Sequence, residues 1–163
     1  MANKDIVKGA EPQGELLSAN SYLAGAAIYP GDFCKFDAAG KVVQAAASDA
    51  LMGVALSYAS ADGVSVLIAD DPSQKFIIQA DDSTIDAQTD IGLNADIIVA
   101  AANTTYKRSG MELDASTIAT TATLPLKVLR VHPAIDNALG AQVDVVVKIN
   151  NHQLGSHTGT AGV

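Results

Sequence analysis

The sequence predicts a mainly β protein: a compact antiparallel β-sandwich or barrel, jelly-roll-like, with at most one short helix. Two observations support this fold class. Short runs of apolar and β-branched residues recur along the chain, and in 142–150 the residues Val143, Val145, Val147 and Ile149 occupy every second position. Turn residues separate the runs at short intervals, which is typical of sandwiches and barrels.

Eight segments are expected to form strands because each combines β-forming residues with flanking turn residues. A hairpin is expected where the sequence AAGK separates the first two of them. Leu113–Thr121 favours a short helix, with Asp114 or Ser116 as its cap. In chain order, the expected strands are 32–37, 42–46, 51–59, 64–70, 75–80, 96–101, 124–131 and 142–150.

The ends of the chain differ in composition from its middle. Residues 1–20 contain polar, Gly and Pro residues without strand periodicity, which predicts an extended N-terminal arm. Residues 151–163 are small and polar, which predicts a flexible C-terminal tail. The β-rich domain is therefore expected to span residues 21–150, and a chain of 163 residues is long enough to bury one core.

The composition argues against several functions. The formal net charge of −8 disfavours binding to nucleic-acid phosphates, and no apolar run approaches the ~18 residues of a membrane span. With 4% aromatic residues and no Trp, the core must be built from Val, Ile, Leu and Ala. The N-terminal residues lack the apolar stretch of a secretory signal, and a single cysteine, Cys34, excludes an intrachain disulfide. We therefore expect a protein made in a reducing cytoplasm.

The segment DDPSQKFIIQADD (70–82) has two pairs of carboxylates around a short apolar run. It suggests half of a calcium site, a catalytic acid pair, or a strand with acidic ends. In an extended strand Asp71 and Asp81 lie roughly 20–30 Å apart. The two pairs therefore cannot share a calcium ion, whose oxygen ligands lie at about 2.3–2.6 Å. The favoured interpretation is a strand with acidic ends that face solvent, although either pair remains able to join groups from elsewhere.

The histidines and the cysteine show no catalytic or zinc-binding spacing. His132, His152 and His157 are expected at the surface, and Cys34 is expected to be a small core residue. A Cys–His pair remains open, because spacing alone does not exclude it. The sequence contains no recognisable nucleophile or phosphate-binding motif, so we expect neither an enzyme nor a cofactor or catalytic metal.

Asp82, Asp86 and Asp90 lie four residues apart in the segment 81–92. Their pattern does not match that of an EF-hand, and like charges at this spacing repel on a helix. A solvated loop is the favoured interpretation, and a weak cation site is the alternative.

Two longer stretches resemble a known family. GDFCKFDAAGKVVQAAASDALMGVAL, followed by DGVSVLIADDPSQKFIIQADD, resembles the head-decoration (cement) proteins of tailed bacteriophages, and residues 109–154 are similar to structural proteins of the same group. The resemblance covers roughly residues 25–154. It implies a β-rich homo-oligomer, a dimer or a trimer, that binds the major capsid protein. It also implies synthesis in the host cytoplasm and a place on the outer surface of the virion capsid, where the protein stabilises the shell.

The N-terminal arm is a candidate for the capsid contact. Its apolar contact candidates are Ile6, Leu16 and Leu17, and Glu11 and Glu15 are candidates to meet basic capsid residues. The alternative is a disordered lead-in without a role.

Other interpretations remain open. The Ala-rich segments VAAAN (99–103) and QAAAS (44–48) suit either contacts between subunits or a tight core. The alternative function is a tail or fibre module that binds a host-surface carbohydrate, for which the chain has few aromatic residues. A small hydrolase ranks third.

Overall fold

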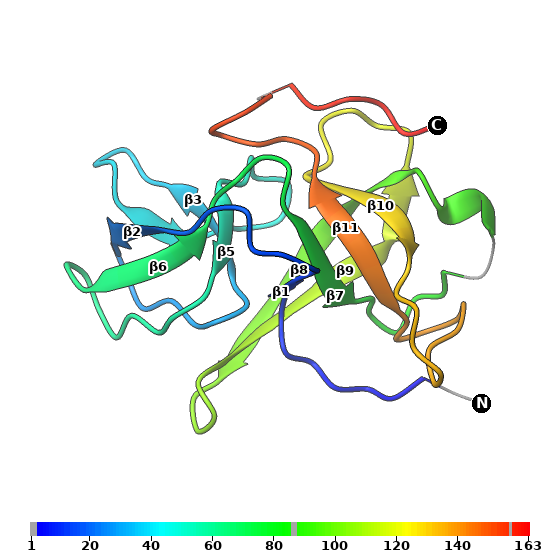
Figure 1. Ribbon diagram of the computed structural model, residues 1–163, viewed down its shortest axis with the longest axis horizontal. Coiled ribbons are helices and arrows are strands. Elements are labelled where there is room, and N and C mark those ends of the chain that lie inside the picture. The colour runs from blue at the N-terminus through cyan, green and yellow to red at the C-terminus, as the bar shows by residue number, and fades with distance from the viewer. Residues whose placement is uncertain (1–2, 86–87, 157) are drawn as a thin grey trace.

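The computed structural model describes residues 3–85, 88–156 and 158–163. Within them the chain forms two antiparallel β-sheets, so the predicted mainly β fold is confirmed, as an open sandwich-like arrangement and not a closed barrel. In Figure 1 the five-stranded sheet lies on the left and the six-stranded sheet on the right. The elements are β1 (Glu11–Pro12), β2 (Asn20–Leu23), β3 (Phe33–Phe36), β4 (Val42–Gln44), β5 (Gly53–Ala55), β6 (Ser65–Ala69), β7 (Lys75–Gln79), the 3-10 helix η1 (Gln88–Asp90), β8 (Asn94–Asn103), β9 (Arg108–Ala119), β10 (Leu126–Val131) and β11 (Asp144–Ile149).

The six-stranded sheet has the order β1-β7-β11-β10-β8-β9. The alternation predicted for 142–150 places Val145 and Val147 of β11 in the core, between β7 and β10. The end of β7 approaches β9, where the amide of Asp81 donates to the carbonyl of Leu113 at 3.0 Å. The sheet is therefore strongly curved around its core.

The five-stranded sheet has the order β2-β6-β5-β3-β4. The expected hairpin is confirmed as β3 and β4, with Phe36 opposite Val42. Neighbouring residues of β3 belong to two different hydrophobic clusters. Phe33 belongs to the larger cluster, between the two sheets, and Cys34 belongs to a smaller cluster on the other face of the five-stranded sheet. Cys34 is fully buried, as expected of a core residue.

The larger hydrophobic cluster joins the two sheets. It contains Val54 and Ala69 from the five-stranded sheet, together with Ile78 and Leu113 from the β7–β9 side of the other sheet. Aromatic residues are few, so small aliphatic side chains fill most of this core. The two sheets thus share one core and position each other.

The predicted helix at Leu113–Thr121 is wrong, because residues 113–119 belong to β9. They pair with β8, which places Leu113 opposite Ile97 and Ala119 opposite Asn94. The expected cap residues do bond locally, since the amide of Ser116 donates to the Asp114 carboxylate at 3.1 Å. That bond lies beside an irregularity in the β8–β9 register, so the local polar contacts mark a bulge and not a helix start.

The N-terminal segment also differs from the prediction of an extended arm. Residues 3–19, called the strap below, lie against the body of the protein, and β1 adds a short strand beside β7. Ala10 is buried, and its amide donates to the carbonyl of Gly31 at 2.9 Å. Gly9 makes this close approach possible: its φ is +75°, and a Cβ there would lie 2.5 Å from the Gly31 oxygen. Sequence periodicity misses such a segment because backbone hydrogen bonds and polar side chains such as Asn3, and not an alternating apolar face, attach it.

The C-terminal residues are likewise bonded to the body, in contrast to the predicted flexible tail. Gln153 bonds through both backbone and side chain, to the carbonyl of Leu51 at 2.8 Å and to the amide of Phe36 at 2.8 Å. The Asn150 carboxamide accepts from the amide of Thr160 at 3.0 Å, and the amide of Val163 donates to the carbonyl of Gly92 at 3.2 Å. Hydrogen bonds that involve the backbone therefore hold these small polar residues against the sheets, and burial of apolar side chains contributes little.

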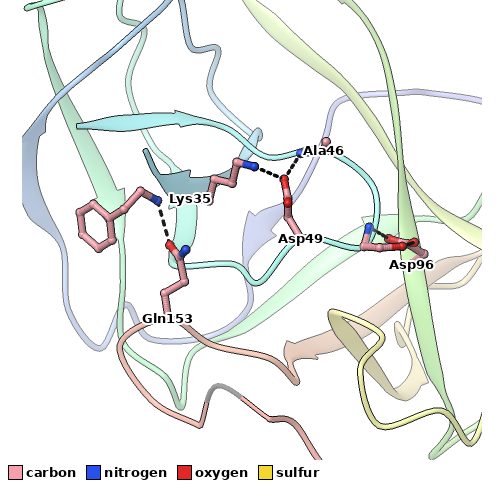
Figure 2. A network of polar contacts seen from close by, with 7 residues as sticks. Lys35, Ala46, Asp49, Asp96 and Gln153 are labelled. Atoms are coloured by element: carbon pink, nitrogen blue, oxygen red, sulfur yellow. Dashed lines mark hydrogen bonds and ion pairs between the residues drawn. The ribbon is translucent and has the colours of Figure 1, made fainter. Parts of the chain in front are cut away.

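A polar bridge, shown in Figure 2, links the loop after β4 to the long strand β8. The buried carboxylate of Asp96 accepts from the amide and hydroxyl of Ser48 at 2.7 and 2.6 Å, and from the amide of Ile97 at 2.7 Å. In the same loop Asp49 pairs with Lys35 at 2.6 Å. The bridge thus ties an edge of one sheet to the other sheet.

Asp32 is a fully buried acid at the turn before β3. One carboxylate oxygen accepts from the amide of Tyr29 at 2.9 Å, whereas the other has no hydrogen-bond partner in the described part of the chain. Burial raises the pKa of Asp32, against the opposing effect of Ser109, the Tyr29 amide and Gln44. Proton binding to Asp32 is therefore stronger in the folded protein than in the unfolded chain.

The raised pKa of Asp32 predicts a pH-dependent effect of Asp32→Asn. The contribution of Asp32 is fully present below its unfolded pKa of about 3.9 and is lost as pH rises through its folded pKa. The unfolding free energy of Asp32→Asn minus that of the wild type should therefore increase between pH 4 and pH 7. Asp62→Asn is the control: Lys41 lowers the pKa of the exposed Asp62, so any effect of its titration falls below about pH 4, and this difference should stay nearly constant between pH 4 and pH 7. Denaturant unfolding across this pH range measures both differences, and a constant difference for Asp32→Asn would contradict the prediction.

Candidate functional site

Two buried glutamines, Gln74 just before β7 and Gln79 at its end, hold the strap by its backbone. The Gln79 side chain accepts from the amide of Ile6 at 3.0 Å and donates to the carbonyl of Lys4 at 2.6 Å. At the other end of β7, Gln74 accepts from the amide of Leu17 at 2.8 Å and donates to the carbonyl of Glu15 at 3.3 Å. Gln79 and Gln74 are 4% and 2% exposed, and the strap supplies the donor to each side-chain oxygen, while each NH2 group also donates to a carbonyl outside the strap.

This attachment leaves side chains of the strap free. Ile6 is 52% exposed, and Leu16 and Leu17 are 43% and 52% exposed. Glu15 is also exposed, whereas Glu11 pairs with Lys8 at 2.9 Å. Leu16 and Leu17 are adjacent at the Gln74 end, and Ile6 lies at the Gln79 end. The five predicted contact residues therefore do not form one patch, although all of them lie on the strap.

Sequence reasoning missed the two glutamines that position the strap. Both lie in the segment 70–82, which attracted attention for its carboxylates. The available signal was a Gln on each side of the apolar run Phe76–Ile78, where a buried carboxamide requires partners. Gln74 and Gln79 are also five residues apart, a distance of about 17 Å in a strand, and this separation determines which strap residues they reach.

The carboxylates around β7 take structural roles. Asp70 is buried, contrary to the expected solvent-facing ends, and it accepts from Asn20 at 2.9 Å and from the Tyr22 hydroxyl at 2.5 Å. Burial and the Asp70 carboxylate raise the pKa of Tyr22 to about 12. For Asp70, burial acts to raise the pKa, but hydrogen bonds led by that of Tyr22 outweigh it, so the pKa is lowered. Asp71 accepts from the amide of Ser73 at 2.7 Å within a turn.

At the other end of β7, Asp81 accepts from the amide of Ala115 at 3.1 Å, and Asp82 accepts from Gln142 at 2.8 Å. Asp86 lies outside the described residues, so the spacing of Asp82, Asp86 and Asp90 is not tested. Among the described residues, no three His, Cys, Asp or Glu side chains group closely enough to hold a metal ion.

The histidines differ from one another. His152 is buried, contrary to the expected surface position, and its Nδ1 accepts from the amide of Leu154 at 3.0 Å. His132 is half-buried, and its backbone pairs with Asp144. His157 lies outside the described residues. In the described ranges, no helix is long and apolar enough to cross a membrane.

Comparison with protein-family models, curated proteins and solved structures finds no match for this chain.

Proposed function

We propose that this chain is a structural virion protein that binds the outer surface of a tailed-phage capsid and stabilises the shell. The major capsid protein is the proposed partner. The observation that carries the proposal is the exposure of Leu16 and Leu17 on a backbone that Gln74 holds to the body. The sequence resemblance supports the capsid as the surface that covers them.

The physical basis is burial of apolar surface by a segment that is already ordered. Exposed leucines gain free energy when a partner removes them from water, at about 25 cal/mol per Å². A free arm would lose conformational freedom of about 1–2 kcal/mol per residue on binding. The strap loses this freedom when the protein folds, so more of the contact energy remains for binding.

The test compares two double variants of equal chemistry on capsids that lack this protein. Leu16→Asp with Leu17→Asp should reduce capsid occupancy at least about tenfold, because charges replace the apolar contact. Leu139→Asp with Leu154→Asp, at two exposed leucines outside the strap, should leave occupancy unchanged. Unfolding temperatures should match the wild type for both. Equal occupancy for the two double variants would contradict the proposal, and binding to host cells in place of capsids would favour the carbohydrate-binding alternative.

Point variants are required here because deletion of residues 1–20 would not isolate binding. Deletion would remove the buried Ala10 and the partners of Gln74 and Gln79, so the deleted protein is expected to unfold more easily.

A further inference from the structure

The hairpin of β8 and β9 projects beyond the shared core and below the five-stranded sheet (Figure 1). Successive side chains of β9 lie on opposite faces of the strand. On one face Ser109, Met111 and Leu113 are buried; on the other, Arg108 is exposed and Glu112 is half-buried. Arg108, Gly110 and Glu112 therefore occupy alternate positions of one strand, and about 13 Å separates the first from the last.

The first part of this strand, from Arg108 to Glu112, has opposite charge at its two ends. Lys107 and Arg108 form the only adjacent basic pair in a chain with a net charge of −8. At the other end, Glu112 lines a hollow with Asp5, Asp81 and Asp82. Burial raises the pKa of Glu112, and the three aspartates raise it further. Among the described residues, no ion pair involves any of these four carboxyl groups.

At the basic end, too, the described residues form no ion pair. Lys107 lies over the ring of Tyr58, 4.8 Å from its centre, whereas Arg108 belongs to none of the ion pairs among the described residues. The nearby Lys8 and Glu11 pair with each other. Arg108 is therefore available to a partner.

The surface between the two ends is mostly apolar and carries small side chains. Val7, Ala100, Ala101 and Gly110 line a shallow hollow there, with Asn103, Ser109 and Glu112 at its polar part, and Ala100 and Ala101 are exposed. Gly110 permits the close backbone packing at this point, since a Cβ would lie 2.4 Å from the oxygen of Ala101. Ala100 and Ala101 of the segment VAAAN (99–103) therefore do not belong to a tightly packed core, which was one of the two interpretations of this segment.

We propose that this face binds a second copy of the same chain across a two-fold axis that passes near Ala101. A basic end, an apolar middle and an acidic end make the face self-complementary, as an isologous contact requires. Rotation by 180° brings Arg108 of each copy to Glu112 of the other. The contact extends the homo-oligomer part of the proposed function. It is tested without capsids, so its failure is distinguishable from failure of capsid binding.

Charge reversal tests the pairing. Arg108→Glu and Glu112→Arg, each alone, should raise the dimer dissociation constant at least about tenfold, and the double variant should restore it to near the wild-type value. Arg130→Glu, at an exposed arginine of β10, is the matched control and should leave dimerisation unchanged. Analytical ultracentrifugation measures the constants, and thermal unfolding verifies that each variant folds. A monomeric wild type, or a dimer that Arg108→Glu leaves intact, would overturn the proposal.

A cysteine substitution tests the two-fold axis independently. Cys34 is buried, so a single new cysteine reports on its own surroundings. Ala101→Cys should form a covalent dimer under mild oxidation at protein concentrations where Ala61→Cys, at an exposed loop, remains monomeric. Equal cross-linking of the two variants would overturn the assignment of the axis.

Discussion

Asp96→Ala is expected to destabilise the protein by about 3–5 kcal/mol. The substitution removes a buried carboxylate that accepts hydrogen bonds from Ser48 and Ile97. Hydrogen bonds to charged groups contribute about 1.5–3 kcal/mol each; the buried amide of Ile97 loses this acceptor, whereas water can replace it at the exposed Ser48. For a domain of this size, the unfolding temperature should fall by roughly 6–20 °C. Calorimetry measures the change.

The matched control is Asp62→Ala, which removes an exposed aspartate paired with Lys41. Exposed ion pairs contribute little to stability, so this variant should unfold close to the wild-type temperature. Asp96→Asn should lie between wild type and Asp96→Ala, because its one carbonyl oxygen retains part of the acceptor capacity. Asp96→Ala with the stability of Asp62→Ala would show that the bridge between the sheets is not a stabilising contact.

The sequence predicts the β class and several strands well, because side-chain burial leaves a period-two pattern. Residues 64–70 and 75–80 contain β6 and β7, and 142–150 contains β11. In each of these segments a hydrophobic core selects alternate residues. In 51–59, by contrast, only Gly53–Ala55 forms a strand, because an apolar run does not specify where pairing stops.

Other elements could not be predicted because tertiary pairing determines them. Residues 113–119 carry local helix signals, yet β8 pairs with them along the hairpin. Strap and tail residues lie on the sheets through backbone hydrogen bonds, which leave no hydrophobic period in the sequence. The composition of these segments is equally compatible with a helix at 113–121 and with a free arm and tail.

For the candidate site, the sequence indicated the segment but not its geometry. Ile6, Leu16 and Leu17 were named from the sequence as apolar candidates for a capsid contact, and in the structure their side chains are exposed. The attachment of their backbone depends on Gln74 and Gln79, which are distant in the sequence and flank the two ends of β7. The alternation of Arg108 and Glu112 becomes meaningful only when β9 is known to be a strand.

Phe33→Ala and Phe76→Ala should each lower the free energy of unfolding by about 3–5 kcal/mol. The two rings come from different sheets and meet edge to face in the shared core, with centroids 5.9 Å apart. Both side chains are fully buried, and each truncation leaves a cavity among small aliphatic residues that have little freedom to fill it. Chemical denaturation of both single variants measures the losses.

The double variant tests whether the two sheets unfold together. The loss of unfolding free energy in the double variant should be smaller than the sum of the two single losses by about 0.5–1.5 kcal/mol. Each single variant already removes the contact between the two rings, so the sum includes that contact twice. Phe36→Ala is the control, since Phe36 is half-buried and contacts Tyr22 in the smaller cluster. Phe36→Ala should lower the free energy of unfolding by less than Phe33→Ala. Its loss and that of Phe76→Ala should simply sum in their double variant.

One cooperative transition is expected for every variant, because both sheets contribute residues to the larger cluster. Two separate transitions in Phe33→Ala would show that each sheet is stable alone, and the bridge through Asp96 would then connect two independent units.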